Sequence, residues 1–175
     1  TLLNVAELRE LLPVYNREGN TGLYKYVMEM PQEEVNRILE PLIRNIEEIY
    51  RDTGPEKEDE DYWVAKAAKL FCPPGHIDRG IFSFYLLNLV HLQKGEAIFQ
   101  DAGIPHAYLE GQNVEIMANS DNVLRGGLTS KHISVSDLLK HVNTEPVLPQ
   151  IIQPGKISDT EKKYEVPVND FQLSI

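Results

Sequence analysis

Residues 95–110 have the sequence GEAIFQDAGIPHAYLE, and the fold prediction starts from this stretch. Gly95 lies in a turn, residues 97–99 form a short apolar segment, Gly103 marks a second turn, and His106 follows. Glycine readily adopts the backbone conformations that tight turns require. The stretch therefore predicts a strand, a turn and a second strand that carries a histidine.

Short apolar segments on both sides extend this pattern. We expect strands at residues 82–89, 97–99, 114–118 and 124–128. Turn residues separate them, including the asparagine-rich segment 119–122. Short strands joined by such turns are typical of a β-sandwich or barrel.

The preceding segment has helical periodicity. Apolar residues recur at spacings of three and four over residues 2–12 and 35–50. Gly19 and Asn20 interrupt the pattern between them, and Pro41 is expected to kink or split the second helix. A third helix is predicted at residues 62–71.

Two further elements follow the β-rich part. Residues 134–142 predict a helix with Ser136 as its cap. Three prolines then mark a linker-like stretch, and residues 162–175 are expected to open another β-element. The fold class is therefore α+β.

Composition excludes several classes of function. The chain of 175 residues has a net charge of −10, which argues against nucleic acid as a partner but allows a single sugar phosphate. Its only cysteine, Cys72, cannot form a disulfide within the chain, so a cytoplasmic location is expected. The longest apolar run, residues 81–90, is too short to cross a membrane.

The strand–turn–strand pattern around His106 resembles the second half of a cupin barrel (jelly roll), in which such a histidine binds a metal. Glu96, Asp101 and Glu110 depart from the usual cupin residues. On this pattern alone, His106 is either a metal ligand or a hydrogen-bonded structural histidine.

Two longer segments carry a more specific resemblance. Residues 103–109 (GIPHAYL) and 114–131 (VEIMANSDNVLRGGLTSK) closely resemble type I phosphomannose isomerases in both order and spacing. Residues 78–96 resemble the strand just upstream in that family. The main departure is Gly126, where the family usually has alanine.

The resemblance implies an isomerase that interconverts mannose 6-phosphate and fructose 6-phosphate through a cis-enediol, with one Zn²⁺ per complete site. His106 would be a zinc ligand, Tyr108 would line the pocket, and Arg125 would hold the phosphate or stabilise the enediolate. Lys131 would be a second cation near the sugar phosphate, unless it is a solvated surface residue.

Arg125 has a structural alternative as well, since it could instead pair with Glu115 or Asp121. The catalytic base is not assigned by the sequence. The remaining histidines, which are expected to be structural or at the surface, are His76, His91, His132 and His141.

The family's other zinc ligands, a Gln-x-His pair and a glutamate, have no counterpart in this sequence. One histidine cannot hold a catalytic zinc by itself. We therefore expect an internal fragment that is inactive alone. It would comprise a helical domain at 1–75, the second half of the catalytic barrel at 76–145, and a linker with the first strand of a C-terminal β-domain at 146–175. Exposed half-barrel edges would invite self-association.

Three other functions remain open. The chain could be a non-catalytic cupin-like module that binds sugar or metal. It could be an interaction domain that docks through its helices. Glucose 6-phosphate isomerase or epimerase activity is the third alternative.

Overall fold

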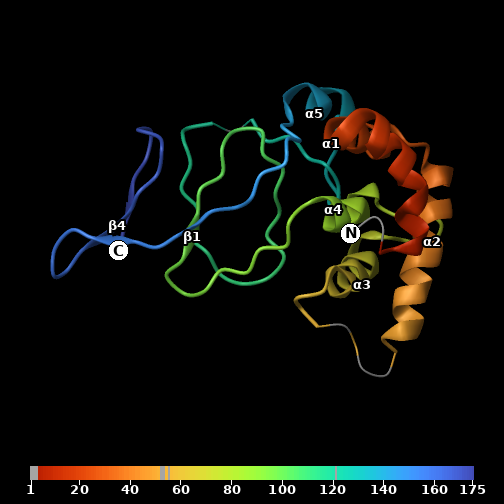
Figure 1. Ribbon diagram of the computed structural model, residues 1–175, viewed down its shortest axis with the longest axis horizontal. Coiled ribbons are helices and arrows are strands. Elements are labelled where there is room, and N and C mark those ends of the chain that lie inside the picture. Colours follow the sequence, from red (N-terminus) through yellow and green to blue (C-terminus); the bar gives the residue numbers. More distant parts are fainter. Residues whose placement is uncertain (1–3, 52–53, 55, 121) are drawn as a thin grey trace.

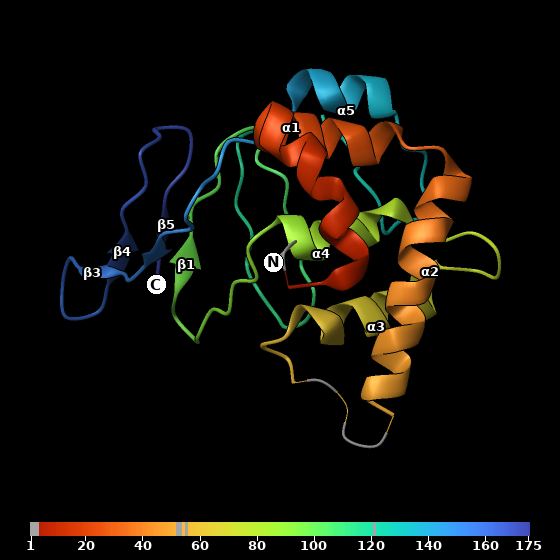
Figure 2. The same ribbon diagram turned by 45° about the vertical axis from the view of Figure 1, so that its right-hand side comes forward.

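The computed structural model describes residues 4–51, 54, 56–120 and 122–175. Figures 1 and 2 show the helices gathered at one end of the molecule and the short strands at the other. The helical elements are the 3₁₀ helix η1 (Ala6–Leu11), α1 (Leu12–Glu29), α2 (Gln32–Ile49), α3 (Glu60–Phe71), the 3₁₀ helix η2 (Arg79–Phe82), α4 (Ser83–Leu86) and α5 (Val135–His141).

The predicted stripe of apolar residues forms the buried face of α2. Pro31 caps this helix, and its carbonyl accepts the N–H groups of Glu34 at 3.0 Å and Val35 at 3.1 Å. Pro41 does not split the helix, so that alternative is wrong. Pro41 is exposed, and the stripe on both sides of it packs into the same core, which outweighs one missing helix hydrogen bond.

The predicted interruption at Gly19 is confirmed. Gly19 has φ 66° and ψ −163° inside α1, a conformation available almost only to glycine. The first turns, η1, contribute Leu8 and Leu11 to the core, and the part of α1 after Gly19 contributes Leu23 and Val27. Leu2, the first apolar residue of the pattern predicted over residues 2–12, lies outside the described residues.

The predicted strand at residues 82–89 is wrong, because η2 and α4 occupy its first half. Asp78 caps η2, with its Oδ1 accepting the N–H of Gly80 at 2.7 Å. Ile81, Phe82 and Tyr85 are buried, a helical spacing rather than an alternating one. Aromatic and leucine residues here are compatible with both the period of a helix and that of a strand. The cap at Asp78 stabilises the helical alternative.

The helix predicted at residues 134–142 is confirmed as α5. Leu138 packs with Tyr24 and Met28, which holds α5 against α1, as Figure 1 shows. Its cap is Ser134 rather than Ser136, and the Ser134 hydroxyl donates to Asp137 at 2.6 Å.

The strands are short and antiparallel. β1 (Ala97–Ile98) pairs with β2 (Ile151–Ile152), and β4 (Lys162–Tyr164) lies between β3 (Gly155–Lys156) and β5 (Leu173–Ser174). The strand predicted at 97–99 is confirmed over two residues. Residues 114–118 and 124–128, which were expected to be strands, form no strand in the structure.

Candidate functional site

His106 lies on the loop that follows β1. Its ring is exposed, and Nδ1 is 2.9 Å from the carbonyl oxygen of Ile104. Nδ1 donates in the tautomer that satisfies this carbonyl, and Nε2 then carries the lone pair. The edge of the Tyr108 ring lies beside it, with the ring centres 5.9 Å apart. The local structure therefore presents His106 with one nitrogen fixed and the other able to bind a metal.

Tyr108 is oriented by a carboxylate. Its hydroxyl donates to Glu115 Oε1 at 2.8 Å, and the side chain is 63% exposed. Partial burial, followed by this hydrogen bond, raises the pKa of Tyr108 above its ordinary value. Tyr108 thus stays protonated at neutral pH, and because Glu115 receives its single hydroxyl proton, the phenolic oxygen is left to accept from a sugar hydroxyl.

The suggested pairing of Arg125 with Glu115 is not formed, and Glu115 accepts from Tyr108. The alternative partner, Asp121, lies outside the described residues. Arg125 is partly buried and has no salt bridge with any residue that the structure describes. Lys131 is exposed, and its backbone N–H donates to Thr129 Oγ1 at 3.1 Å.

The loop between Arg125 and Lys131 is fixed to the helical part of the molecule. Leu128 N–H donates to Asp78 Oδ2 at 2.9 Å, and Leu128 has a positive φ of 52°. Gly127 lies so close to Gly80 that a Cβ on Gly127 would be 2.5 Å from the Gly80 Cα. The two cations therefore lie on a loop whose backbone is anchored at its centre.

A second contact joins the loop of His106 to α3. Glu110 accepts hydrogen bonds from Lys57 and, at 2.7 Å, from Lys66. These two lysines lower the pKa of Glu110 to about 2. Apart from the departure of Glu110 from the cupin pattern, no feature of the sequence indicates this role.

Asp78 and Glu110 are the residues of interest that sequence reasoning missed. The order Asp-x-Gly at residues 78–80 was a usable signal, since aspartate often caps a helical turn by accepting the N–H two residues later. Nothing local indicated that its second oxygen would hold a residue from a distant loop.

Within the described part of the chain, no group of three or more His, Cys, Asp or Glu side chains is arranged to hold a metal ion. His106 is thus a single candidate ligand in this structure. No helix among the described residues is long and apolar enough to span a membrane.

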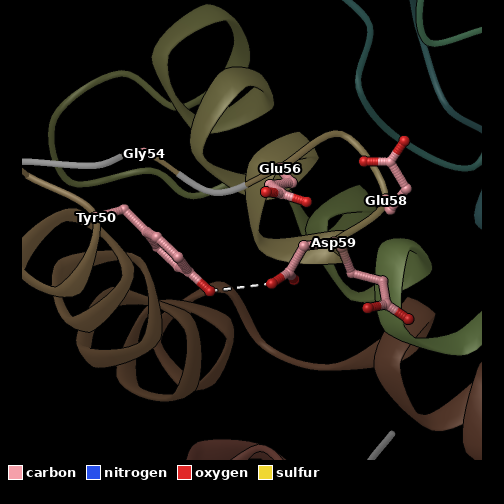
Figure 3. A pocket seen from close by; sticks show the side chains of 6 residues that line it. Tyr50, Gly54, Glu56, Glu58 and Asp59 are labelled. Carbon is pink, nitrogen blue, oxygen red and sulfur yellow. Dashed lines mark hydrogen bonds between the residues drawn. The ribbon is translucent and has the colours of Figure 1, made fainter.

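A hollow lies elsewhere, between the end of α2 and the start of α3 (Figure 3). Its lining includes Tyr50, Asp59 and three glutamates, and the Tyr50 hydroxyl donates to Asp59 at 3.0 Å. Burial and this bond raise the pKa of Tyr50 to about 12. The negative charges of these carboxylates repel the negative charge of a sugar phosphate, so this hollow is a poor candidate for the substrate site.

Comparison with known proteins gives consistent matches. No protein-family model matches the chain. Mannose-6-phosphate isomerase from Salmonella typhimurium is 35% identical over 169 residues, which cover 96% of this chain and 40% of that protein. The Escherichia coli enzyme is 37% identical over 160 residues (90% and 38%), and the Mus musculus enzyme is 45% identical over 104 residues (57% and 24%).

Solved structures agree. Crystal structures of the Salmonella typhimurium enzyme match with a TM-score of 0.76 at 34% identity and cover 99% of this chain and 43% of that one. One of them contains fructose 6-phosphate and zinc. The chain spans about two fifths of the length of the bacterial relatives.

The proteins that this chain matches belong to one class, the isomerases that act on a sugar phosphate. The resemblance to type I phosphomannose isomerases is thereby confirmed, and the chain is homologous over nearly all of its length to a segment of mannose-6-phosphate isomerase.

Proposed function

We propose that this chain is part of a zinc-dependent aldose–ketose isomerase that interconverts mannose 6-phosphate and fructose 6-phosphate. The observation that carries the proposal is His106, which stands in the matched segment with its Nδ1 held by the Ile104 carbonyl at 2.9 Å. Metal-binding histidines commonly donate their second ring nitrogen in this way, which leaves Nε2 for the metal. His106 therefore fits the role of one zinc ligand.

When bound, zinc would supply Lewis-acid polarisation of the sugar's carbonyl and hydroxyl oxygens, which acidifies the adjacent C–H. Isomerisation moves a proton between C1 and C2 by way of a cis-enediol, so negative charge develops on these oxygens. Arg125 would stabilise that charge or hold the phosphate, and Lys131 would add a second cation. Tyr108, whose hydroxyl donates to Glu115, would accept a hydrogen bond from a substrate hydroxyl.

The remaining ligands of the site would come from residues outside this sequence, because His106 alone cannot hold a catalytic zinc. On this proposal the 175-residue chain has no isomerase activity of its own. The proposed organisation remains a helical domain at 1–75, half of a cupin barrel at 76–145 and a linker with a further β-element at 146–175. The pairing of β1 with β2 joins the last two of these units.

The incomplete barrel would also leave apolar side chains uncovered. Val114 is 79% exposed, Val123 59% and Met117 56%. A face of this kind favours association with another strand-bearing surface. We expect the isolated chain to self-associate through it, and a concentration-independent monomer in sedimentation equilibrium would contradict this.

Zinc content and isomerase turnover, measured on this chain and on a longer chain extended upstream from the same gene, test the proposed function. We expect one zinc and turnover only in the longer chain, with both lost in His106→Ala. His76→Ala, at an exposed histidine outside residues 78–96, 103–109 and 114–131, is the control and should retain both.

Two outcomes would count against the proposal. One zinc per short chain would show that the remaining ligands lie within these 175 residues or in a second copy. Zinc without turnover in the longer chain would favour a non-catalytic metal-binding module.

A further inference from the structure

The loop that carries Arg125 and Lys131 is anchored by one carboxylate from the helical part. Asp78 Oδ1 accepts Gly80 N–H at 2.7 Å, and Asp78 Oδ2 accepts Leu128 N–H at 2.9 Å. Asp78 is itself held, because its N–H donates to Cys72 Sγ at 3.3 Å at the end of α3. A single residue therefore connects α3, η2 and the loop at residues 125–131, the first through its backbone N–H and the other two through its carboxylate.

The backbone contacts beneath this carboxylate leave little room for adjustment. A Cβ on Gly80 would be 2.9 Å from Leu128 N, and a Cβ on Gly127 would be 2.8 Å from Gly80 N. On the other side, Gly126 faces the Tyr24 hydroxyl, which would be 2.8 Å from an added Cβ. Residues 126–128 are thus enclosed between α1 and η2, and Arg125 directly precedes them.

Leu128 adopts a conformation that needs support. Its φ of 52° is unusual for a residue with a branched side chain and persists only where the surroundings impose it. The hydrogen bond to Asp78 provides this support, because it fixes the direction of the Leu128 N–H. If the bond were lost, the peptide between Gly127 and Leu128 could turn, and Arg125 would be displaced with it.

We propose that Asp78 is a positioning residue for the isomerase site: its carboxylate fixes the loop at residues 125–131 and so determines where Arg125 is presented to the substrate. This inference rests on the role proposed above for Arg125. Only a carboxylate offers two acceptor oxygens and no donor, which matches the two N–H groups it receives. Asparagine has a single acceptor and would leave one of them unsatisfied.

The anchoring itself is tested in the 175-residue chain by NMR-detected amide exchange. In Asp78→Asn we expect the protection of the Leu128 amide to fall about tenfold, the typical effect of losing one hydrogen bond to a charged acceptor. Asp59→Asn is the matched control, because Asp59 accepts Asp61 N–H and the Tyr50 hydroxyl but does not touch the loop. Unchanged protection at Leu128 in Asp78→Asn would overturn the proposal.

The functional consequence is tested in the longer zinc-loaded chain. Asp78→Asn is expected to lower kcat/KM about tenfold or more at unchanged zinc content, whereas Asp59→Asn leaves it within about twofold. In an Arg125→Ala background the same Asp78→Asn change should have no further effect, because a positioning residue acts only through the group it positions.

The two levels of test can fail separately. If the longer wild-type chain shows no turnover, the proposed function fails while the exchange result still decides whether Asp78 anchors the loop. If Asp78→Asn lowers kcat/KM equally with and without Arg125, the effect is general destabilisation and the positioning role is refuted.

Discussion

Replacing Gly127 with alanine adds one methyl group, and we expect it to destabilise the protein strongly. Gly127 has φ 144°, where residues with a Cβ are strained at a cost of about 1–3 kcal/mol. The new Cβ would also be 2.5 Å from the Gly80 Cα, and such overpacking costs about 1–3 kcal/mol more. We therefore expect Gly127→Ala to lower the free energy of unfolding by about 2–6 kcal/mol.

Two control variants separate these contributions. Gly19→Ala introduces backbone strain alone, because Gly19 has a positive φ with no atom within 4 Å of an added Cβ. It should cost about 1–3 kcal/mol. Gly80→Ala introduces crowding without a positive φ, since its Cβ would be 2.8 Å from the Leu128 side chain. It should also cost about 1–3 kcal/mol.

Urea unfolding followed by tryptophan fluorescence measures all three. The only tryptophan, Trp63, is 8% exposed in α3 and should report the loss of the helical core. The variants should shift the midpoint at constant m-value. If Gly127→Ala costs no more than Gly19→Ala, Gly127 does not lie close to Gly80 in solution, and the loop is not anchored as described.

Three further predictions concern other contacts. Burial raises the pKa of Asp61, so the free energy of unfolding should fall as the pH rises through that folded-state pKa. Asp61→Asn should remove this pH dependence in urea unfolding between pH 4 and 7. The same fall in the variant as in the wild type would contradict this assignment. Because Lys57 and Lys66 lower the pKa of Glu110 to about 2, the contact of Glu110 with these lysines should be fully present above the unfolded-state pKa and be lost as the pH falls toward 2. Amide protection at residues 106–110 should fall over the same pH range. In Glu110→Gln it should not depend on pH there. Gly126→Ala should cost about 1–3 kcal/mol and Tyr24→Phe should recover part of the loss, so simple additivity in a double-mutant cycle would exclude the contact.

The helices could be predicted because the apolar spacing and the glycine that indicate them lie within each helix's own sequence. The stripe on α2 needs no distant partner to be recognised, and Gly19 marks the interruption of α1 by its residue type alone. Residues 82–86 were misassigned because Phe, Tyr and Leu fit two periods, and the deciding cap, Asp78, acts on backbone groups that composition does not show.

The strands and the site depend on partners far along the chain. Residues 114–118 have the composition of a strand, but a strand also requires a neighbour. For the site, the matched segments nominated His106, Tyr108, Arg125 and Lys131, whose roles remain predictions. The bonds to His106, to Tyr108 and to the loop at residues 125–131 come from Ile104, Glu115 and Asp78, and only the first is close enough in sequence to be anticipated.

The pairing of β1 with β2 has a consequence for the order of folding. Ile98 pairs with Ile151 across a long stretch of the C-terminal half of the chain, whereas η1 contacts α1 and α2 over shorter separations in sequence. Closing a long loop costs entropy before any contact compensates for it. The helices should therefore form early in refolding, and the closure that brings β1 to β2 should be a later kinetic phase, detectable at residues 97–98 by pulsed hydrogen exchange after Trp63 is already buried.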